Sequence, residues 1–183
     1  ISSGTLQKIL KNSNYLKALQ QQNTDHYVPV WFLRQAGRYL PEYKAVRARF
    51  SDFFEMIKTP QVCCELTLQP LRRFHLDAAI TFSDILTIPE ALVNEISFIE
   101  GRGPVFKEAI KNGDNPKLDI GGFENLDYVF EATQLIKSKI DVPLIGFAGS
   151  PWTIFIYSFY GESPRDFNLV REFVAKRPEQ TKE

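Results

Sequence analysis

The sequence predicts an α/β fold in which parallel strands alternate with outer helices. Three strand-like apolar runs lie at residues 28–33, 76–82 and 143–147, and helical patterns separate them. The second run is apolar almost throughout, as expected of a strand in a parallel sheet covered on both faces. Strands that alternate with helices in this way indicate βα units.

The first predicted elements are a helix, a strand and a second helix. Leucine and isoleucine recur at helical spacing between Thr5 and Gln21, which predicts an amphipathic helix outside the first strand. Residues 28–33 are rich in β-branched and aromatic side chains, so we expect a buried strand there. Pro41 suits the first turn of a helix that continues to Phe50.

Two further helices are predicted before the second strand. Ser51 is expected to cap a short helix that ends at Met56. Pro60 opens a longer helix that reaches Arg73, with a kink expected at Pro70.

The remaining elements continue the alternation. They are a short helix near 89–92, a strand over 96–99, a helix over 123–139, a helix opened by Pro151 that passes Tyr157, and a last helix over 165–176. Residues 112–122 are rich in Gly, Asn, Asp and Pro, so we expect an exposed loop. A closed (β/α)8 TIM barrel takes about 250 residues. We therefore expect one partial domain over residues 1–183, the N-terminal portion of such a barrel, with 1–27 as a helical extension.

Composition excludes several classes of protein. The chain has 183 residues, with 22 basic and 22 acidic side chains, so no global field favours nucleic acid or a membrane surface. No apolar run approaches the roughly 20 residues of a membrane span. The only cysteines, Cys63 and Cys64, are neighbours that make a poor disulfide, which suits a reducing compartment. His26 and His75 lie outside any metal-ligand spacing, so we expect no metal. The chain begins without methionine, and we expect it to be part of a longer sequence.

The most informative segment follows the first predicted strand. Arg34 and Arg38 lie four residues apart in a glycine-containing loop, and residues 31–50 carry five basic side chains against one acidic. Loops after strands hold the sites of α/β folds, and a guanidinium binds carboxylate or phosphate oxygens two at a time. We therefore expect an anionic ligand here. Solvated surface charge is the alternative.

The other predicted strands also end in polar or small residues. Asp84 follows the second strand, and residues 146–152 follow the third. In a barrel these loops share the C-terminal rim, so we expect them to face one pocket. Asp84 suits equally a helix cap, and the glycines of 146–152 suit either an anion cradle or close packing. Trp152 is expected in the core.

Four segments resemble the uroporphyrinogen decarboxylase family. They are RQAGRYLPE at 34–42, CCELTLQP at 63–70, FSDIL at 82–86 and IGFAGSPWT at 145–153. The resemblance runs from about Pro29 to the end of the chain. Cys63 and Cys64 with their surroundings resemble the eukaryotic form, whereas His75 stands where many members have proline.

The resemblance implies a single-domain (β/α)8 barrel that works as a cytosolic homodimer. Members convert the four acetate arms of uroporphyrinogen III to methyls, giving coproporphyrinogen III and carbon dioxide without a cofactor. Arg34 and Asp84 match catalytic positions, Asp84 as the acceptor for the pyrrole N–H groups, with nearby arginines keeping it ionised. The positions that match substrate-binding residues are Arg34, Gln35, Ala36, Gly37, Arg38, Arg47, Asp84, Phe147 and Tyr157.

Two other functions remain open at this point. A related barrel methyltransferase shares the fold but binds zinc and a corrinoid methyl carrier, and the arginine loop argues against it. A truncated, inactive paralogue is the non-enzyme alternative, because the family's substrate-contacting serine and histidine lie in the second half of the barrel.

Overall fold

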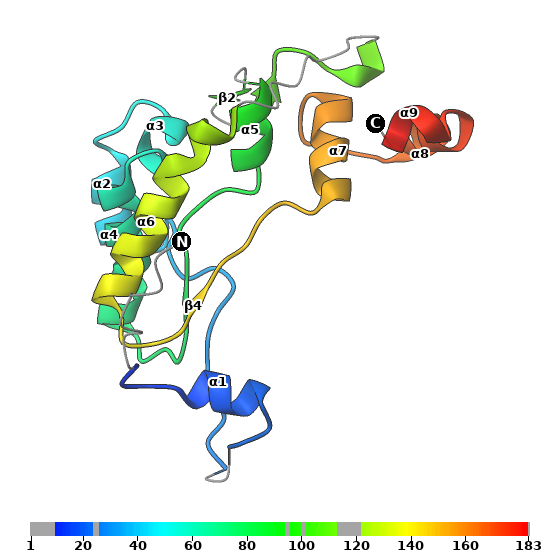
Figure 1. Cartoon of the computed structure of the whole chain (residues 1–183). Helices are drawn as coiled ribbons and strands as arrows, with labels where there is room; N and C mark the ends of the chain where they lie inside the picture. Colours follow the sequence, from blue (N-terminus) through cyan, green and yellow to red (C-terminus); the bar gives the residue numbers. More distant parts are fainter. Residues whose placement is uncertain (1–9, 24–25, 94–95, 100–101, 113–121, 183) are drawn as a thin grey trace. The chain divides into compact units, whose positions relative to one another are not determined.

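Figure 1 shows the computed structural model of the chain, which describes residues 10–23, 26–93, 96–99, 102–112 and 122–182. Its helices are α1 (Asn14–Leu19), α2 (Pro41–Arg47), α3 (Phe53–Ile57), α4 (Pro60–Arg73), α5 (Thr87–Val93), α6 (Asp127–Lys139), α7 (Pro151–Tyr160), α8 (Asn168–Lys176) and α9 (Pro178–Lys182), with 3-10 turns η1 (Ile110–Asn112) and η2 (Gly122–Leu126). Its strands are β1 (Ala79–Ile80), β2 (Ile96–Ile99), β3 (Gly103–Phe106) and β4 (Leu144–Ile145).

The chain folds as two compact units. The first comprises Ile1–Ser83 with Asp127–Phe147, and the second comprises Asp84–Leu126 with Ala148–Glu183.

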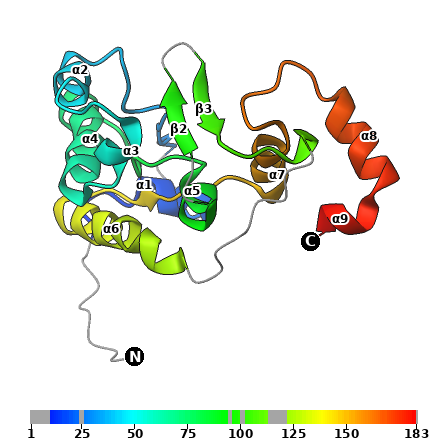
Figure 2. The same cartoon turned by 90° about the horizontal axis from the view of Figure 1, so that it is seen from above.

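The first unit is built on a parallel strand pair. β1 pairs with β4 in the register Ala79↔Leu144 and Ile80↔Ile145. Helices α4 and α6 lie side by side in both views, and their contact carries the core of the unit (Figures 1 and 2). Cys64, Ala79, Ile136 and Ile140 form this core, with partly buried leucines packed around them. Parallel strands with flanking helices confirm the predicted α/β class.

The helices of the first unit begin close to the predicted residues. Pro41 and Pro60 each occupy the first turn of a helix, where the missing N–H costs nothing. The cap of α3 differs from the prediction, because Asp52 and not Ser51 is the N-cap. Asp52 is extended and its carboxylate accepts a hydrogen bond from the Glu55 amide at 3.1 Å. Of the predicted helix over 5–21, only α1 is formed, and residues 5–9 lie outside the described residues.

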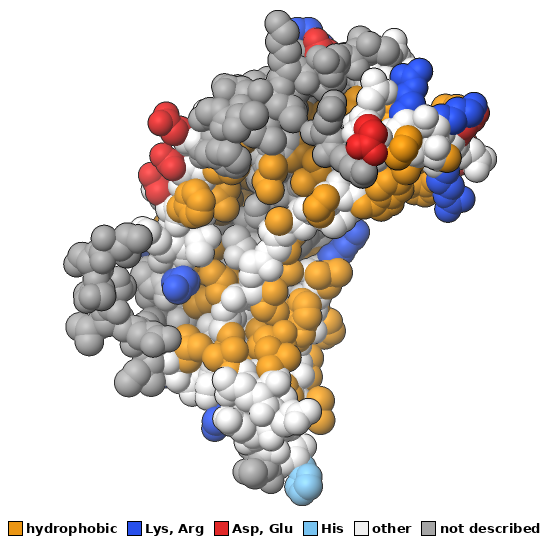
Figure 3. Space-filling view, turned by 45° about the vertical axis from the view of Figure 1, so that its right-hand side comes forward, with side chains coloured by type: hydrophobic (Ala, Val, Ile, Leu, Met, Phe, Trp, Pro, Cys, Tyr) orange, Lys and Arg blue, Asp and Glu red, His pale blue; other side chains and the backbone are white. Residues whose placement is uncertain are grey.

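Residues 28–33 are not the buried strand that the sequence predicts. Val28 is 75% exposed and Leu33 is 70% exposed. The one backbone hydrogen bond between this segment and the rest of the described chain joins the Asp77 amide to the Val30 carbonyl at 2.9 Å. An apolar segment becomes a strand only where neighbouring backbone completes a ladder. The Ala78 carbonyl and the Ile80 amide, which do not bond to β4, bond to the Gln35 side chain instead. Figure 3 shows hydrophobic side chains exposed across the visible face.

The second unit combines a hairpin with helices. β2 and β3 are antiparallel, in the register Ile96↔Phe106. β2 matches its prediction, whereas β3 was not predicted because Gly103 and Pro104 are turn signals. Helices α7 and α8 pack together through a core of buried side chains, Ile156, Phe159, Tyr160 and Val170.

Helix ends and loops agree only in part with the sequence predictions. Gly161 ends α7 with φ at +73°, the conformation that favours glycine at a helix end. α9 forms where the sequence shows only a polar ending, and most of the predicted loop over 112–122 lies outside the described residues. In the parts of the chain that are described, no helix is long and apolar enough to cross a membrane.

Candidate functional site

The arginine loop, residues 34–40, presents its cations outward. Arg34 and Arg38 are exposed, and no ion pair joins either to a carboxylate of the described residues. Arg47 is half-buried on α2, and its Nη1 donates to the Phe50 carbonyl at 2.5 Å. Burial raises the pKa of Tyr43, and the guanidiniums of Arg47 and Arg38 oppose that rise. Arg38 and Arg47 therefore lie near one hydroxyl, and together they form a basic cluster suited to an anion.

Buried residues at both ends hold this loop. The Gln35 side chain is 2% exposed, its Nε2 donates to the Ala78 carbonyl at 2.8 Å, and its Oε1 accepts from the Ile80 amide at 3.2 Å. Leu40 is 1% exposed, and its amide closes a turn on the Gly37 carbonyl at 3.0 Å. The Gln35 side chain is thus engaged by β1, and the Gln35 carbonyl accepts from the Tyr39 hydroxyl.

Asp84 lies where the chain enters α5. Its Oδ1 accepts from the Leu86 amide at 2.8 Å, and its carbonyl accepts from the Thr87 hydroxyl at 2.9 Å. Asp84 thus closes a turn just before α5, whose first residue is Thr87. Burial raises the pKa of Asp84, and the Leu86 N–H lowers it. The direction is opposite to the expectation of a carboxylate held ionised by arginines, because no arginine contributes.

Gly149 lies against the backbone next to Asp84. A Cβ on Gly149 would lie 2.5 Å from the Ile85 carbonyl oxygen and 3.0 Å from Cγ1 of Ile154. Ser150 then caps α7 by accepting from the Thr153 amide at 3.2 Å. Of the two roles that the sequence allows for these small residues, close packing is the one with contacts to support it.

We expect Gly149→Ala to lower the free energy of unfolding by about 1–3 kcal/mol, the usual cost of overpacking. The clash is with backbone, which cannot move aside as a flexible side chain does. Urea unfolding followed by circular dichroism measures the effect. Gly146→Ala is the matched control, since nothing lies within 4 Å of a Cβ there. Equal stability of the two variants would contradict the packing role.

The aromatic residues of the third strand-end loop divide between the units. Phe147 is 40% exposed at the end of the first unit, and Tyr157 is half-buried on α7 in the second. Trp152 is 48% exposed and stacks on Phe155 with ring centroids 5.8 Å apart, so the prediction that it lies in the core is wrong. Trp152 lies in the first turn of α7, which precedes the residues that pack in the core, Phe155 and Phe159 among them.

The structure therefore groups the predicted site residues into two sets. Arg34, Arg38 and Arg47 belong to the first unit with Phe147, and Asp84 and Tyr157 belong to the second. The convergence of the three strand-end loops on one pocket stays a prediction.

Asp77 is a buried anchoring residue that no pattern in the sequence predicts. It is fully buried, and its carboxylate accepts from the Val30 amide at 2.7 Å, the Tyr27 hydroxyl at 2.9 Å and Asn12 Nδ2 at 2.8 Å. Burial raises the pKa of Asp77, but these hydrogen bonds and the nearby His75 outweigh it and hold the pKa below its usual value. The available signal was a lone carboxylate inside the apolar run 76–82.

The lowered pKa makes the contribution of Asp77 to stability dependent on pH. It is fully present above the unfolded-state pKa of about 3.9 and is lost as the pH falls through the lower folded-state pKa. We expect Asp77→Asn to cost about 1–3 kcal/mol of unfolding free energy at neutral pH, with a smaller difference from wild type below about pH 4. Urea unfolding between about pH 3 and 7 tests this. A difference that does not change with pH would contradict it.

The cysteines are unsuited to nucleophilic chemistry. Both are free and buried, and burial raises the pKa of Cys63 to about 12. The Cys63 thiol donates to the Ile57 carbonyl at 2.9 Å. Among the described residues, no group of three His, Cys, Asp or Glu side chains is placed to hold a metal.

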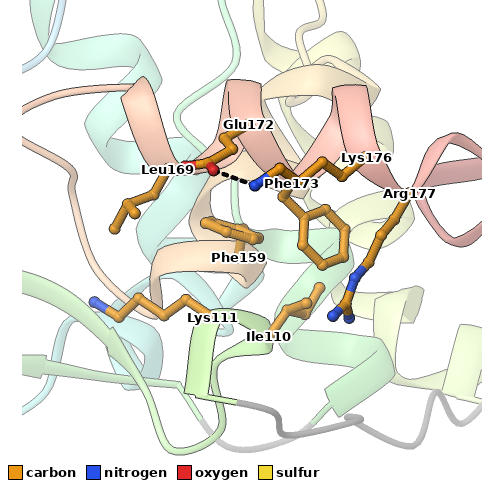
Figure 4. Close-up of a pocket in the computed structure, with 8 residues that line it drawn as sticks. All are labelled: Ile110, Lys111, Phe159, Leu169, Glu172, Phe173, Lys176 and Arg177. Carbon is orange, nitrogen blue, oxygen red and sulfur yellow. Dashed lines mark hydrogen bonds and ion pairs between the residues drawn. The ribbon is translucent and has the colours of Figure 1, made fainter.

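A pocket of about 340 Å³ lies in the second unit, and none of the predicted site residues lines it (Figure 4). Its lining residues are Ile110, Lys111, Phe159, Leu169, Glu172, Phe173, Lys176 and Arg177. Its cations already have partners. Lys176 pairs with Glu172, Arg177 lies over the Phe173 ring, and Lys111 lies over Tyr160. Its apolar side chains Ile110, Phe159 and Phe173 belong to the core of this unit.

Comparison with a solved structure supports the fold. A methyltransferase from Methanosarcina mazei superposes with a TM-score of 0.66 over 95% of this chain and 51% of that chain. At 19% sequence identity the likeness shows the fold alone.

Comparisons of sequence identify the family. The family model described as uroporphyrinogen decarboxylase (URO-D) matches residues 10–183. Uroporphyrinogen decarboxylases from Neisseria meningitidis serogroup C and Francisella tularensis subsp. novicida are 47% and 48% identical to this chain and cover 93% and 90% of it. The chain covers 49% and 48% of those proteins, so it spans about half the length of the curated relatives it matches. The chain belongs to the uroporphyrinogen decarboxylase family.

Proposed function

We propose that this chain supplies the N-terminal half of a uroporphyrinogen decarboxylase, a carboxy-lyase of porphyrin biosynthesis. The complete protein is a (β/α)8 barrel of one domain that acts as a cytosolic homodimer. It converts uroporphyrinogen III to coproporphyrinogen III and carbon dioxide. The observation that carries this proposal is the arginine loop, exposed and anchored, inside a family match that extends from residue 10 to 183.

The substrate accounts for the basic cluster. Uroporphyrinogen carries eight carboxylates, and Arg34, Arg38 and Arg47 offer guanidiniums that bind such groups in pairs of hydrogen bonds. Each charge-assisted hydrogen bond contributes about 1.5–3 kcal/mol. Several together orient the acetate arm that reacts, which lowers the entropic part of the barrier.

Asp84 supplies the electrostatic part of the reaction. Protonation of a pyrrole carbon gives a cationic ring. The bond between the acetate methylene and its carboxylate then breaks, carbon dioxide leaves, and the electron pair enters the ring. A proton added to the methylene carbon gives the methyl group, and loss of the ring proton restores the pyrrole. The Asp84 carboxylate accepts from the pyrrole N–H groups and stabilises the cation as it forms.

The substrate also affects the ionisation of Asp84, because its binding displaces solvent from the carboxylate. Burial in the protein alone raises the pKa of Asp84. Pyrrole N–H donors and the ring cation favour the ionised form, so the substrate itself supplies the charge that a buried carboxylate requires. The ring acts as the electron sink, which leaves no step for pyridoxal or thiamine cofactors.

The remaining half of the barrel covers residues 28–33 in this proposal. In a complete barrel the missing strands lie beside this segment, and the exposed Val28, Phe32 and Leu33 become core. Half a barrel otherwise leaves a strand edge open to other chains.

Anaerobic incubation with uroporphyrinogen III tests the proposal. We expect the full-length protein to form coproporphyrinogen, measured by chromatography of the oxidised porphyrins. This chain alone is assayed beside it, which also tests the inactive-paralogue alternative. A folded full-length protein that forms no coproporphyrinogen would contradict the proposed function.

A further inference from the structure

Two buried side chains fasten residues 27–35 to the chain around β1. At one end, the Asp77 carboxylate accepts from the Val30 amide at 2.7 Å and from the Tyr27 hydroxyl at 2.9 Å. The Asp77 amide in turn donates to the Val30 carbonyl at 2.9 Å. At this end the Asp77 carboxylate binds the Val30 amide, and the Asp77 amide binds the Val30 carbonyl.

At the other end, Gln35 takes the place of a strand neighbour. Its amide donates to the Ala78 carbonyl at 2.8 Å and accepts from the Ile80 amide at 3.2 Å. A side-chain amide presents a donor and an acceptor side by side, as a peptide group does. Gln35 thus satisfies backbone groups of β1 that a ladder with residues 28–33 would otherwise use.

Between these two points, the Trp31 ring packs edge-on against Tyr15, with centroids 6.2 Å apart. Val28, Phe32 and Leu33 are largely exposed, and the segment forms no regular ladder with β1. Arg34 directly precedes Gln35, and Arg38 follows it within one turn. The place of the Arg34 guanidinium therefore depends on where Asp77 and Gln35 hold the chain, whereas Arg38 is also held by the buried Leu40.

We propose that Asp77 and Gln35 are positioning residues that clamp residues 27–35 onto β1 and so set the arginine loop for a polycarboxylate ligand. The ligand class rests on the proposed function, whereas the clamp stands on the contacts alone. The two clamp positions, 77 and 35, require different side chains. Asp77 faces donors only and suits a carboxylate, whereas Gln35 faces one donor and one acceptor and suits an amide.

Hydrogen exchange and limited proteolysis of this chain test the clamp without any ligand. We expect Gln35→Met to speed exchange of the Ile80 amide at least tenfold, and Asp77→Asn to do the same for Val30. Tryptic cleavage after Arg34 and Arg38 should also become at least tenfold faster, while cleavage after Arg72 stays at the wild-type rate. Ile136→Val, in the core of the same unit, is the control for a general loss of stability. Unchanged exchange and cleavage in both clamp variants would overturn the proposal.

Gln35→Glu gives a pH-dependent version of the same test. The ionised carboxylate accepts from Ile80 but opposes the Ala78 carbonyl, whereas the protonated carboxyl donates to that carbonyl as the amide does. We expect rapid cleavage after Arg34 at neutral pH and cleavage near the wild-type rate, relative to Arg72, once this carboxyl is protonated. A pH-independent ratio would overturn the role of the amide.

Binding of uroporphyrin, an octacarboxylate probe, then separates the clamp from the proposed function. We expect its dissociation constant for the full-length protein to rise at least tenfold in Gln35→Met, with recovery by Gln35→Glu at acidic pH. A wild-type protein that does not bind the probe contradicts the proposed function and leaves the clamp intact. Wild-type affinity in a variant whose loop is cleaved rapidly contradicts the positioning role.

Discussion

Asp84→Asn is expected to lower the rate of coproporphyrinogen formation by the full-length protein about 10²- to 10³-fold, the usual effect of removing one preorganised electrostatic group. The amide keeps an oxygen for the Leu86 N–H, so the entry into α5 is preserved. What it loses is the negative charge that opposes the ring cation. The measurement is the initial rate at saturating uroporphyrinogen III, because the loss should lie in kcat.

The same substitution should not destabilise the protein at neutral pH. Burial raises the pKa of Asp84 in the folded state, so the stability linked to this group is fully present below the unfolded pKa of about 3.9. That stability is lost as the pH rises through the folded pKa. An asparagine cannot ionise and avoids this loss. Urea unfolding at pH 7 should therefore give a free energy at least equal to wild type.

Asp52→Asn is the matched control for the charge. It removes a carboxylate that likewise accepts from a backbone amide at a helix start, the N-cap of α3, and it matches none of the predicted site positions. It should keep the wild-type rate. A wild-type rate in Asp84→Asn would show that this carboxylate takes no part in the reaction.

Arg34→Leu and Arg38→Leu are each expected to weaken uroporphyrin binding about 10- to 100-fold. The range corresponds to the roughly 1.5–3 kcal/mol of a charge-assisted hydrogen bond, at 1.4 kcal/mol per tenfold change. Both side chains are exposed and lack an acidic partner among the described residues, so the fold loses little when they are removed. Fluorescence titration of the full-length protein measures the dissociation constant.

The control for these variants is Arg72→Leu. Arg72 carries the same charge in the same unit, but it is bound to Glu65 through both of its terminal nitrogens, at 2.7 and 2.9 Å. Its removal should change the dissociation constant less than twofold. Equal weakening in all three variants would mean that the ligand responds to net charge and not to the loop.

Local patterns predicted much of the fold because local chemistry determines it. Pro41, Pro60 and Pro151 mark helix starts through their own missing N–H groups, whatever packs nearby. The apolar run at 76–82 contains β1, because a nearly continuous apolar sequence favours a strand that is buried on both faces. The single-domain barrel and the eukaryotic type of this chain stay predictions.

Features that depend on distant partners were less predictable. Residues 28–33 have strand composition, yet whether they form a ladder depends on neighbours that no local pattern names. Asp77 and Gln35 lie 42 positions apart along the chain. Each acquires its role by hydrogen bonding to backbone near the other, Asp77 to Val30 and Gln35 to Ala78. The arginine loop was predictable as a basic site, whereas its attachment to β1 required the structure.

The most direct test is a structure of the full-length protein with bound coproporphyrinogen. We expect Arg34 and Arg38 to lie about 2.7–3.2 Å from product carboxylate oxygens and Asp84 to accept from the pyrrole N–H groups at a similar distance. This would place residues from both units around one tetrapyrrole. A product bound elsewhere, or a tetrapyrrole whose nitrogens lie away from Asp84, would contradict the proposed site.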